Sequence, residues 1–168
     1  MTEASPLPSP QQTADKVREA MYRDDRASKW LGMQILEVTP GRAVLTMTVR
    51  EQMLNGHDIC HGGLISTLAD SAFAYACNSY NELTVASGFG VDLLAPGRLG
   101  DVLTATCHEV SKAGRTGLYD CEVNNQQGQR IAGAFSEGVV AQRVRVVHRA
   151  TDHRHNRQHA LVRADRLA

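Results

Sequence analysis

The sequence has no apolar run that approaches the roughly 20 residues needed to span a bilayer, which excludes a membrane bundle. Its first twelve residues contain three prolines and no apolar core, so they do not resemble a signal peptide. The four cysteines lack both CxxC spacing and the density of a disulfide framework; they are Cys60, Cys77, Cys107 and Cys121. We therefore expect free thiols and a cytoplasmic protein.

The 168-residue chain also lacks net charge, because 18 lysines and arginines balance 18 aspartates and glutamates. The balance favours neither a nucleic-acid nor a membrane partner. The charges are unevenly placed, since Arg143 to Ala168 holds seven arginines and two aspartates, a local charge of +5. We predict three regions, namely a disordered arm over 1–12, one globular domain over 13–144, and a basic, disordered tail over 145–168.

Hydrophobic periodicity and turn residues predict two helices and six strands. The helices are expected over 13–30 and 64–78, and the strands over 33–39, 42–50, 84–94, 101–111, 115–124 and 130–140. Residues 116–124 alternate between polar and apolar side chains, which indicates a strand with one wet and one dry face.

The segment 64–78 consists almost entirely of apolar and small residues, which is typical of a helix buried on all sides. It contains one residue of a type that is charged at neutral pH, Asp70. Consecutive hairpins predict an antiparallel sheet, and this helix is the candidate to cover its dry face. We expect an α+β protein with a curved antiparallel β-sheet wrapped around a long central helix, the hot-dog architecture.

The loop before this helix ends in Cys60-His61-Gly62-Gly63. Glycines allow a ligand to approach the backbone closely, and the first N–H groups of a helix lack internal acceptors. These groups can polarise a carbonyl. Asp70 is either part of a structural hydrogen-bond network or an ionised base or nucleophile, and the absence of a charged helical neighbour favours the functional interpretation.

Gly62 and Asp70 are separated by eight residues, about 12 Å along a helix. A single reacting atom cannot lie within about 3 Å of both groups in one chain. If the two groups cooperate, they come from two chains related by a two-fold axis, with antiparallel central helices.

Other chemistry in the loop is less well supported by the residues. His57, Cys60 and His61 together supply at most three metal ligands. The remaining histidine of the predicted domain is His108, and the sequence offers no matching set of ligands, so no metal site is predicted. Cys60 lacks an evident acid or base to activate it as a nucleophile. The other three cysteines are expected in the core.

Several motifs resemble those of the phenylacetyl-CoA thioesterases, hot-dog enzymes of bacterial phenylacetate degradation. The resemblance extends from about residue 20 to residue 140. The segments that carry it are Met53-Leu54-Asn55-Gly56-His57, Cys60-His61-Gly62-Gly63, Leu68-Ala69-Asp70, the run 72–79, Leu94-Ala95-Pro96-Gly97, Gly100-Asp101 and Thr116-Gly117-Leu118-Tyr119-Asp120.

This resemblance implies hydrolysis of acyl-CoA thioesters without a metal or redox cofactor, by a homodimer or homotetramer. The implied substrates are arylacetyl-CoA esters, such as phenylacetyl- or hydroxyphenylacetyl-CoA, or similar medium-sized acyl-CoA esters. Asp70 corresponds to the carboxylate that attacks the thioester or activates water, and the Gly62 N–H to the group that polarises the carbonyl. Asn55 is implied to orient the carbonyl or the water, and His61 to brace the loop.

Further residues are candidates for binding the substrate. Gly63 lies at the helix entrance, and Ser87 and Gly88 begin the strand after the central helix. Lys112 and Arg115 flank a turn and could bind the phosphates of coenzyme A, although a solvated turn explains them equally well. Two other functions stay open, a non-catalytic acyl-CoA binding module and a hot-dog enoyl-CoA hydratase. The sequence does not rank acyl groups.

Overall fold

The computed structural model describes residues 7–140 and residue 146. Most of the predicted tail and the first half of the predicted arm lie outside the described residues. The elements, in chain order, are α1 (Pro10–Asp24), α2 (Arg26–Leu31), β1 (Gln34–Thr39), β2 (Arg42–Thr48), η1 (Glu51–Met53), α3 (Gly62–Asn78), β3 (Thr84–Leu93), β4 (Val102–Ala113), β5 (Thr116–Asn124) and β6 (Arg130–Val140).

The first helix begins three residues earlier than expected, inside the predicted arm. Ser9 and Gln12 form a capping box in which each side chain accepts a hydrogen bond from the other's backbone N–H, at 3.1 and 2.8 Å. Pro10 occupies the first helical position, where its missing N–H has no cost. The predicted single helix is also interrupted at Asp25, whose carboxylate accepts from the Ser28 N–H at 3.0 Å and so starts α2.

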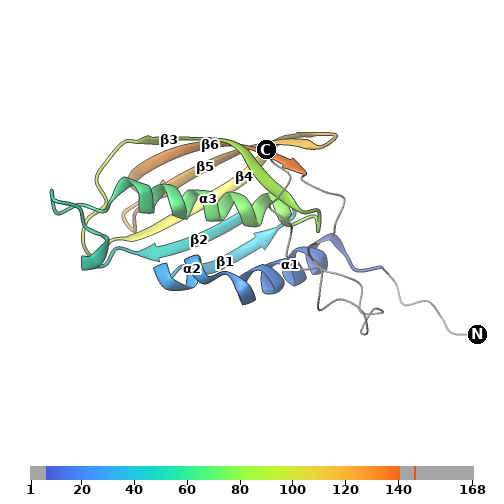
Figure 1. Cartoon of the computed structure of the whole chain (residues 1–168), viewed down its shortest axis with the longest axis horizontal. Helices are drawn as coiled ribbons and strands as arrows, with labels where there is room; N and C mark the ends of the chain where they lie inside the picture. Colours follow the sequence, from blue (N-terminus) through green and yellow to red (C-terminus); the bar gives the residue numbers. More distant parts are fainter. Residues whose placement is uncertain (1–6, 141–145, 147–168) are drawn as a thin grey trace, which may run out of the picture.

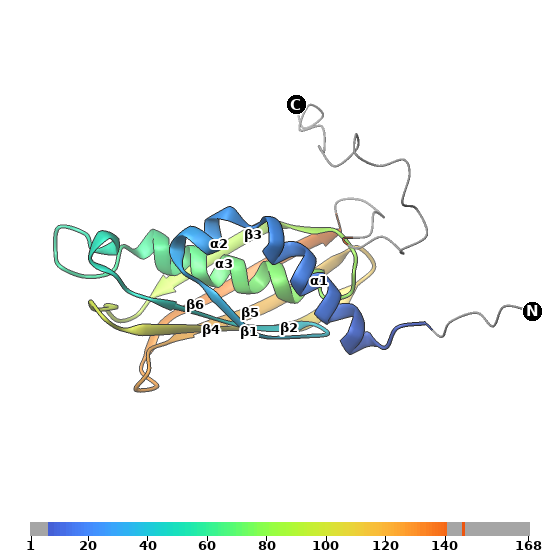
Figure 2. The same ribbon diagram turned by 90° about the horizontal axis from the view of Figure 1, so that it is seen from below.

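The six strands form one antiparallel sheet in the order β1-β2-β4-β5-β6-β3. Helix α3 lies along one face of this sheet and contacts every strand, while α1 packs against β1 and α3 (Figure 1). The view from below shows the sheet curving beneath α3 (Figure 2). The α+β architecture with a central helix is therefore confirmed. None of the described helices is long and apolar enough to cross a membrane.

The alternation predicted for residues 116–124 is present in β5. Tyr119, Cys121 and Val123 are buried beneath α3, whereas Asp120 is exposed and Glu122 half-buried on the outer face. The same two-residue period therefore separates the core from the outer face across the sheet.

Helix α3 is not buried on all sides, so this expectation was wrong. The sheet covers the side that carries Leu68, Phe73 and Ala76, while Asp70 and Gly63 are exposed in the single chain. The polar residues on the side of α3 that faces away from the sheet are small. For this reason the sequence of α3 resembles that of a helix buried on all sides. Asp70 lies on a face that the described residues of its own chain leave open.

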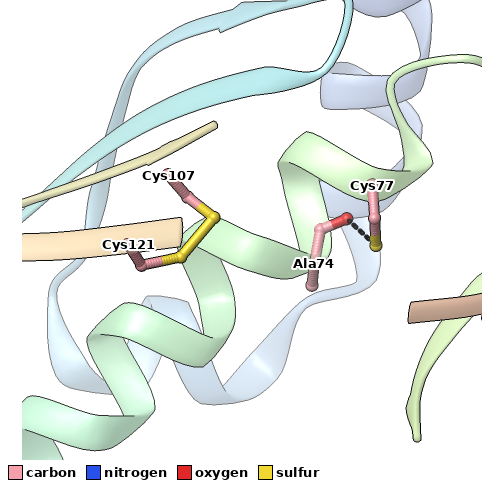
Figure 3. Close-up of a disulfide and its surroundings, with 4 residues drawn as sticks. All are labelled: Ala74, Cys77, Cys107 and Cys121. Carbon is pink, nitrogen blue, oxygen red and sulfur yellow. Dashed lines mark hydrogen bonds between the residues drawn. A yellow bond between two sulfur atoms is a disulfide. The ribbon is translucent and has the colours of Figure 1, made fainter. Parts of the chain in front are cut away.

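The expectation that all four thiols are free was also wrong. Cys107 on β4 and Cys121 on β5 form a disulfide (Figure 3). The two cysteines are direct partners in the β4–β5 register and both point into the core, which brings them together despite a separation of 14 residues. Cys60 and Cys77 are free and buried. Core positions for Cys77, Cys107 and Cys121 are confirmed, since each is at most 1% exposed.

Strand β3 forms one edge of the described sheet and pairs with β6 alone. Three of its apolar side chains remain exposed, at 50% for Val85, 39% for Phe89 and 53% for Leu93. An apolar edge strand is a template for pairing with another chain, and proteins that stay monomeric usually protect such an edge.

Candidate active site

A cavity of about 410 Å³ opens at the N-terminal end of α3. It is bounded by the loop before the helix, the first turns of the helix and the segment that follows β3. Most of its lining is apolar, and Asn55 is the one polar side chain that lines it within the described part of the chain. The lining residues are Asn55, Ile59, Cys60, Gly62, Ile65, Leu93, Leu94, Ala95 and Pro96.

The loop that carries Asn55 is held by short-range hydrogen bonds. The Asn55 N–H donates to the Ile59 carbonyl at 2.9 Å, and the Asn55 Oδ1 accepts from the His57 N–H at 2.9 Å. Asp58 closes the loop in the left-handed region, with φ of 56°. Because Oδ1 is occupied by the loop itself, the amide Nδ2 of Asn55 is the group that can donate to a ligand.

His61 is the N-cap of α3. Its Nδ1 accepts from the Gly63 N–H at 3.0 Å, and its own N–H donates to the Met53 carbonyl at 2.8 Å. The imidazole therefore satisfies one of the free donors at the start of the helix and ties the helix to the preceding loop. This geometry agrees with a bracing function for His61.

The Gly62 N–H points from the first helical position and has no acceptor among the described residues. A Cβ added to Gly62 would lie 2.5 Å from Leu93 Cδ1, so this side chain from β3 covers the glycine closely. The cavity thus combines a free backbone donor, at the positive end of the α3 dipole, with an apolar wall. Such a donor can polarise a carbonyl oxygen.

Asp70 lies two turns further along α3 and does not line this cavity. Partial burial of its carboxylate raises its pKa above the ordinary value of 3.8. The single chain leaves Asp70 and Gly62 about 12 Å apart along the helix, as the sequence predicts. One chain does not bring the two groups together.

The candidate substrate-binding residues lie elsewhere in the chain. The Lys112 ammonium is 2.9 Å from Glu82 and 4.1 Å from the centre of the Tyr80 ring, beyond the C-terminal end of α3. Arg115 lies at the same β4–β5 turn. Ser87 stands at a bulge in β3, where its hydroxyl donates to the Glu137 carbonyl at 3.2 Å. None of these residues, nor Gly88, lines the cavity of its own chain.

Cys60 lines the cavity, but its environment opposes the chemistry of a nucleophile. Burial, and secondarily the Asp101 carboxylate, raise the pKa of this thiol to about 11. The thiol is therefore protonated at neutral pH, and the thiolate is the nucleophilic form. Within residues 7–140 no group of three or more His, Cys, Asp or Glu side chains is placed to hold a metal ion.

Sequence reasoning did not identify the wall formed by residues 93–96. This segment runs from the end of β3 into the residues that follow it. The Cys60 N–H donates to the Gly97 carbonyl at 2.8 Å, which joins the segment to the loop before α3. The strand 84–94 was predicted, and the Leu94-Ala95-Pro96-Gly97 motif contributes to the resemblance. The sequence does not show that residues 93–96 line the cavity. This follows from the position of the end of β3 beside the N-terminus of α3.

Comparisons with known proteins identify the family. The model of the thioesterase superfamily matches residues 57–132. Acyl-coenzyme A thioesterase PaaI of Escherichia coli is 51% identical over 113 residues, which are 67% of this chain and 81% of the relative. The solved structure of E. coli PaaI, described as belonging to the phenylacetic acid degradation operon, superimposes with a TM-score of 0.80 at 44% identity. It matches 81% of this chain and 99% of PaaI.

A more distant structure is also similar. A hypothetical thioesterase of Streptococcus pneumoniae, solved with coenzyme A, has a TM-score of 0.64 and 27% identity, over 67% of this chain and 90% of its own. The hot-dog fold expected from the sequence is confirmed by these comparisons. The chain belongs to the thioesterase superfamily.

Proposed function

We propose that this chain hydrolyses acyl-CoA thioesters, with arylacetyl-CoA esters such as phenylacetyl- or hydroxyphenylacetyl-CoA as its substrate class. The observation that carries the proposal is the free Gly62 N–H at the wall of an apolar cavity. The similarity to a named acyl-CoA thioesterase and to a structure with coenzyme A supports it. An aromatic acyl group suits a cavity lined by Ile59, Ile65 and Leu93.

The Gly62 N–H donates to the thioester oxygen and stabilises the negative charge that develops there. The Asp70 carboxylate then attacks the carbonyl carbon, or removes a proton from the water that attacks it. Collapse of the tetrahedral intermediate breaks the C–S bond and releases coenzyme A, whose sulfur takes up a proton. Where Asp70 is the nucleophile, this step leaves the acyl group on Asp70 as a mixed anhydride, and a water molecule then hydrolyses the anhydride to the free acid and the Asp70 carboxylate. The net reaction consumes one water and yields the free acid and the CoA thiol.

The two groups meet between two chains in this proposal. Asp70 is exposed in the single chain, and the neighbouring β3 edge is apolar through Val85 and Phe89. Antiparallel pairing of two β3 edges aligns the two α3 helices in opposite directions. Each site then combines Gly62 of one subunit with Asp70 of the other, and a homotetramer forms from two such dimers.

We assign roles to the remaining candidate residues from their positions in the structure. The Nδ2 of Asn55 donates to the thioester oxygen or to the water, and His61 and Gly63 keep the helix entrance in place. Lys112 and Arg115 lie beyond the far end of their own α3 helix. In a dimer with antiparallel helices, the C-terminal end of α3 extends past the partner's cavity. Lys112 and Arg115 then bind the phosphates of the coenzyme A whose acyl group lies in that cavity.

The decisive experiment measures CoA release with a thiol reagent, using phenylacetyl-CoA and a panel of short acyl-CoA esters. We expect Asp70→Asn to lower kcat by about 10³-fold, within the range for loss of a general base. The matched control, Asp120→Asn, removes an exposed carboxylate from the outer face of the sheet and is expected to leave kcat unchanged. Binding of these esters without turnover by the wild type would instead establish a non-catalytic binding module.

A further inference from the structure

An exposed aromatic side chain stands on the outer face of the sheet, opposite the face that α3 covers. Phe135 on β6 is 49% exposed, and its direct register partners are Asp120 on β5 and Gly90 on β3. Glu137 follows two residues later on the same face, and Asp92 lies opposite Gly133. We name Asp92, Asp120, Phe135 and Glu137 the Phe135 face.

The glycines around Phe135 leave its ring accessible. A Cβ added at Gly90 or at Gly133 would meet no atom within 4 Å, so open space lies on the β3 side of the ring. A flat group can therefore stack on the ring from this side. A large apolar partner is not favoured, because three carboxylates lie near the ring on this face.

The three carboxylates of the Phe135 face have no cationic partner within 4.0 Å among the described residues. Glu122, which neighbours them on β5, differs because it is paired with Arg130. Three unpaired negative charges thus surround an exposed aromatic ring. Arginine fits both features, since its guanidinium stacks on aromatic faces and binds carboxylates through a planar pair of donors.

We propose that the Phe135 face is a docking surface for the arginine-rich C-terminal segment of this same chain, residues 141–168. That segment begins directly after β6, which ends at Val140, three residues beyond Glu137. Between Arg143 and Ala168 it contains seven arginines and two aspartates, a charge of +5 that complements the three carboxylates. Docking through individual arginines requires no regular structure in the segment.

The segment is long enough to reach the face after reversing direction. Phe135 lies five residues before Val140, about 17 Å along the strand. The nine residues from Val140 to Arg149 extend up to about 30 Å, so Arg149 and every arginine after it can reach the ring. A second copy of the same face is a poor occupant, because two sets of unpaired carboxylates repel each other.

The test is limited proteolysis of the full-length chain with thermolysin, followed by intact mass. Thermolysin cleaves before apolar residues such as Val147 and Leu161, so changes of charged residues create no new cleavage positions. We expect the triple variant Asp92→Lys/Asp120→Lys/Glu137→Lys to lose its C-terminal segment about tenfold faster than the wild type at low salt, as three weak ion pairs permit. High salt is expected to raise the wild-type rate to that of the variant.

The matched control is Glu19→Lys/Asp24→Lys/Glu51→Lys, which makes the same change in net charge at exposed positions away from the face. It is expected to keep the wild-type cleavage rate. The complementary variant Arg149→Glu/Arg154→Glu/Arg157→Glu tests the same contact without altering the folded domain. It is expected to be cleaved as fast as the first triple variant.

Equal rates for the wild type and both charge-reversed variants would overturn the proposal. So would a change of oligomeric state in the Phe135-face variant with an unchanged cleavage rate, because the face then contacts a second copy. Thioesterase activity is not a readout here, so the result is independent of the proposed function.

Discussion

Replacing Gly62 by proline isolates the contribution of one backbone N–H group. Gly62 is the first residue of α3, a position where proline is well tolerated because its N–H would have no helical acceptor. The preceding residue, His61, has φ of −59° and ψ of 127°, which is the extended conformation that a following proline requires. Gly62→Pro therefore removes the proposed donor while keeping the helix.

The matched control is Gly62→Ala, because both substitutions add a Cβ. In each case this atom would lie 2.5 Å from Leu93 Cδ1, but Leu93 is 53% exposed and its side chain can rotate away. Alanine retains the N–H, so the two variants share the added Cβ and differ in the donor and in the Cγ and Cδ atoms that close the proline ring. Loss of one such donor typically costs about 3 kcal/mol in the transition state, which is about 10² to 10³ in kcat.

The assay follows CoA release from phenylacetyl-CoA at saturating substrate for the three proteins, with circular dichroism to confirm folding. We expect Gly62→Ala to retain most of the wild-type kcat and Gly62→Pro to fall about 10²-fold or more below it. An equal loss in both variants would show that steric contact with Leu93, and not the N–H, explains the glycine. The assignment of Gly62 as the polarising group would then be refuted.

Burial raises the pKa of Asp70 above 3.8, and the ionised carboxylate is the active form in the proposed mechanism. Therefore kcat/KM should fall as the pH is lowered, with a midpoint above 3.8. A midpoint at or below 3.8 would contradict the proposed role of Asp70 as nucleophile or general base. Reduction of the Cys107–Cys121 disulfide, which joins residues 14 apart, should lower the free energy of unfolding by about 3 kcal/mol. Denaturant titrations with and without reductant measure this change, and the stability of the Cys107→Ser/Cys121→Ser variant should not respond to the reductant. His61→Ala should cost about 1 kcal/mol of stability through loss of the helix cap to Gly63. His61→Asn, whose side-chain oxygen can accept from the Gly63 N–H in place of Nδ1, should recover most of this loss in thermal unfolding.

Local sequence patterns were sufficient for most of the fold. The strand over residues 130–140 was predicted to the residue, and the polar–apolar alternation of β5 follows the observed burial. Both features depend on neighbours within a few residues. The earlier start of α1 is also a local feature, because the capping box of Ser9 and Gln12 can be recognised in the sequence.

The errors concern contacts that only the tertiary structure brings together. The disulfide depends on the β4–β5 register, which sets Cys107 opposite Cys121, and the sequence alone does not define this register. The exposure of Asp70 depends on which side of α3 the sheet covers, and small residues on both sides of the helix conceal that difference. The wall of the cavity at Leu93 depends on β3 crossing to the far edge of the sheet. The sequence motif includes Gly62, which lines the cavity, but it did not indicate this wall.

Subunit complementation decides whether Gly62 and Asp70 act across two chains. Gly62→Pro and Asp70→Asn each inactivate one group, and equal amounts of the two variants, mixed after dissociation and reassembled, give about half hybrid dimers. In a shared site, one of the two sites of each hybrid combines an intact Gly62 with an intact Asp70, so about a quarter of the wild-type activity should return. If both groups act within one chain, every site keeps one defect and no activity returns. The 12 Å separation along α3 favours recovery, because a single transition state cannot contact both groups of the same helix.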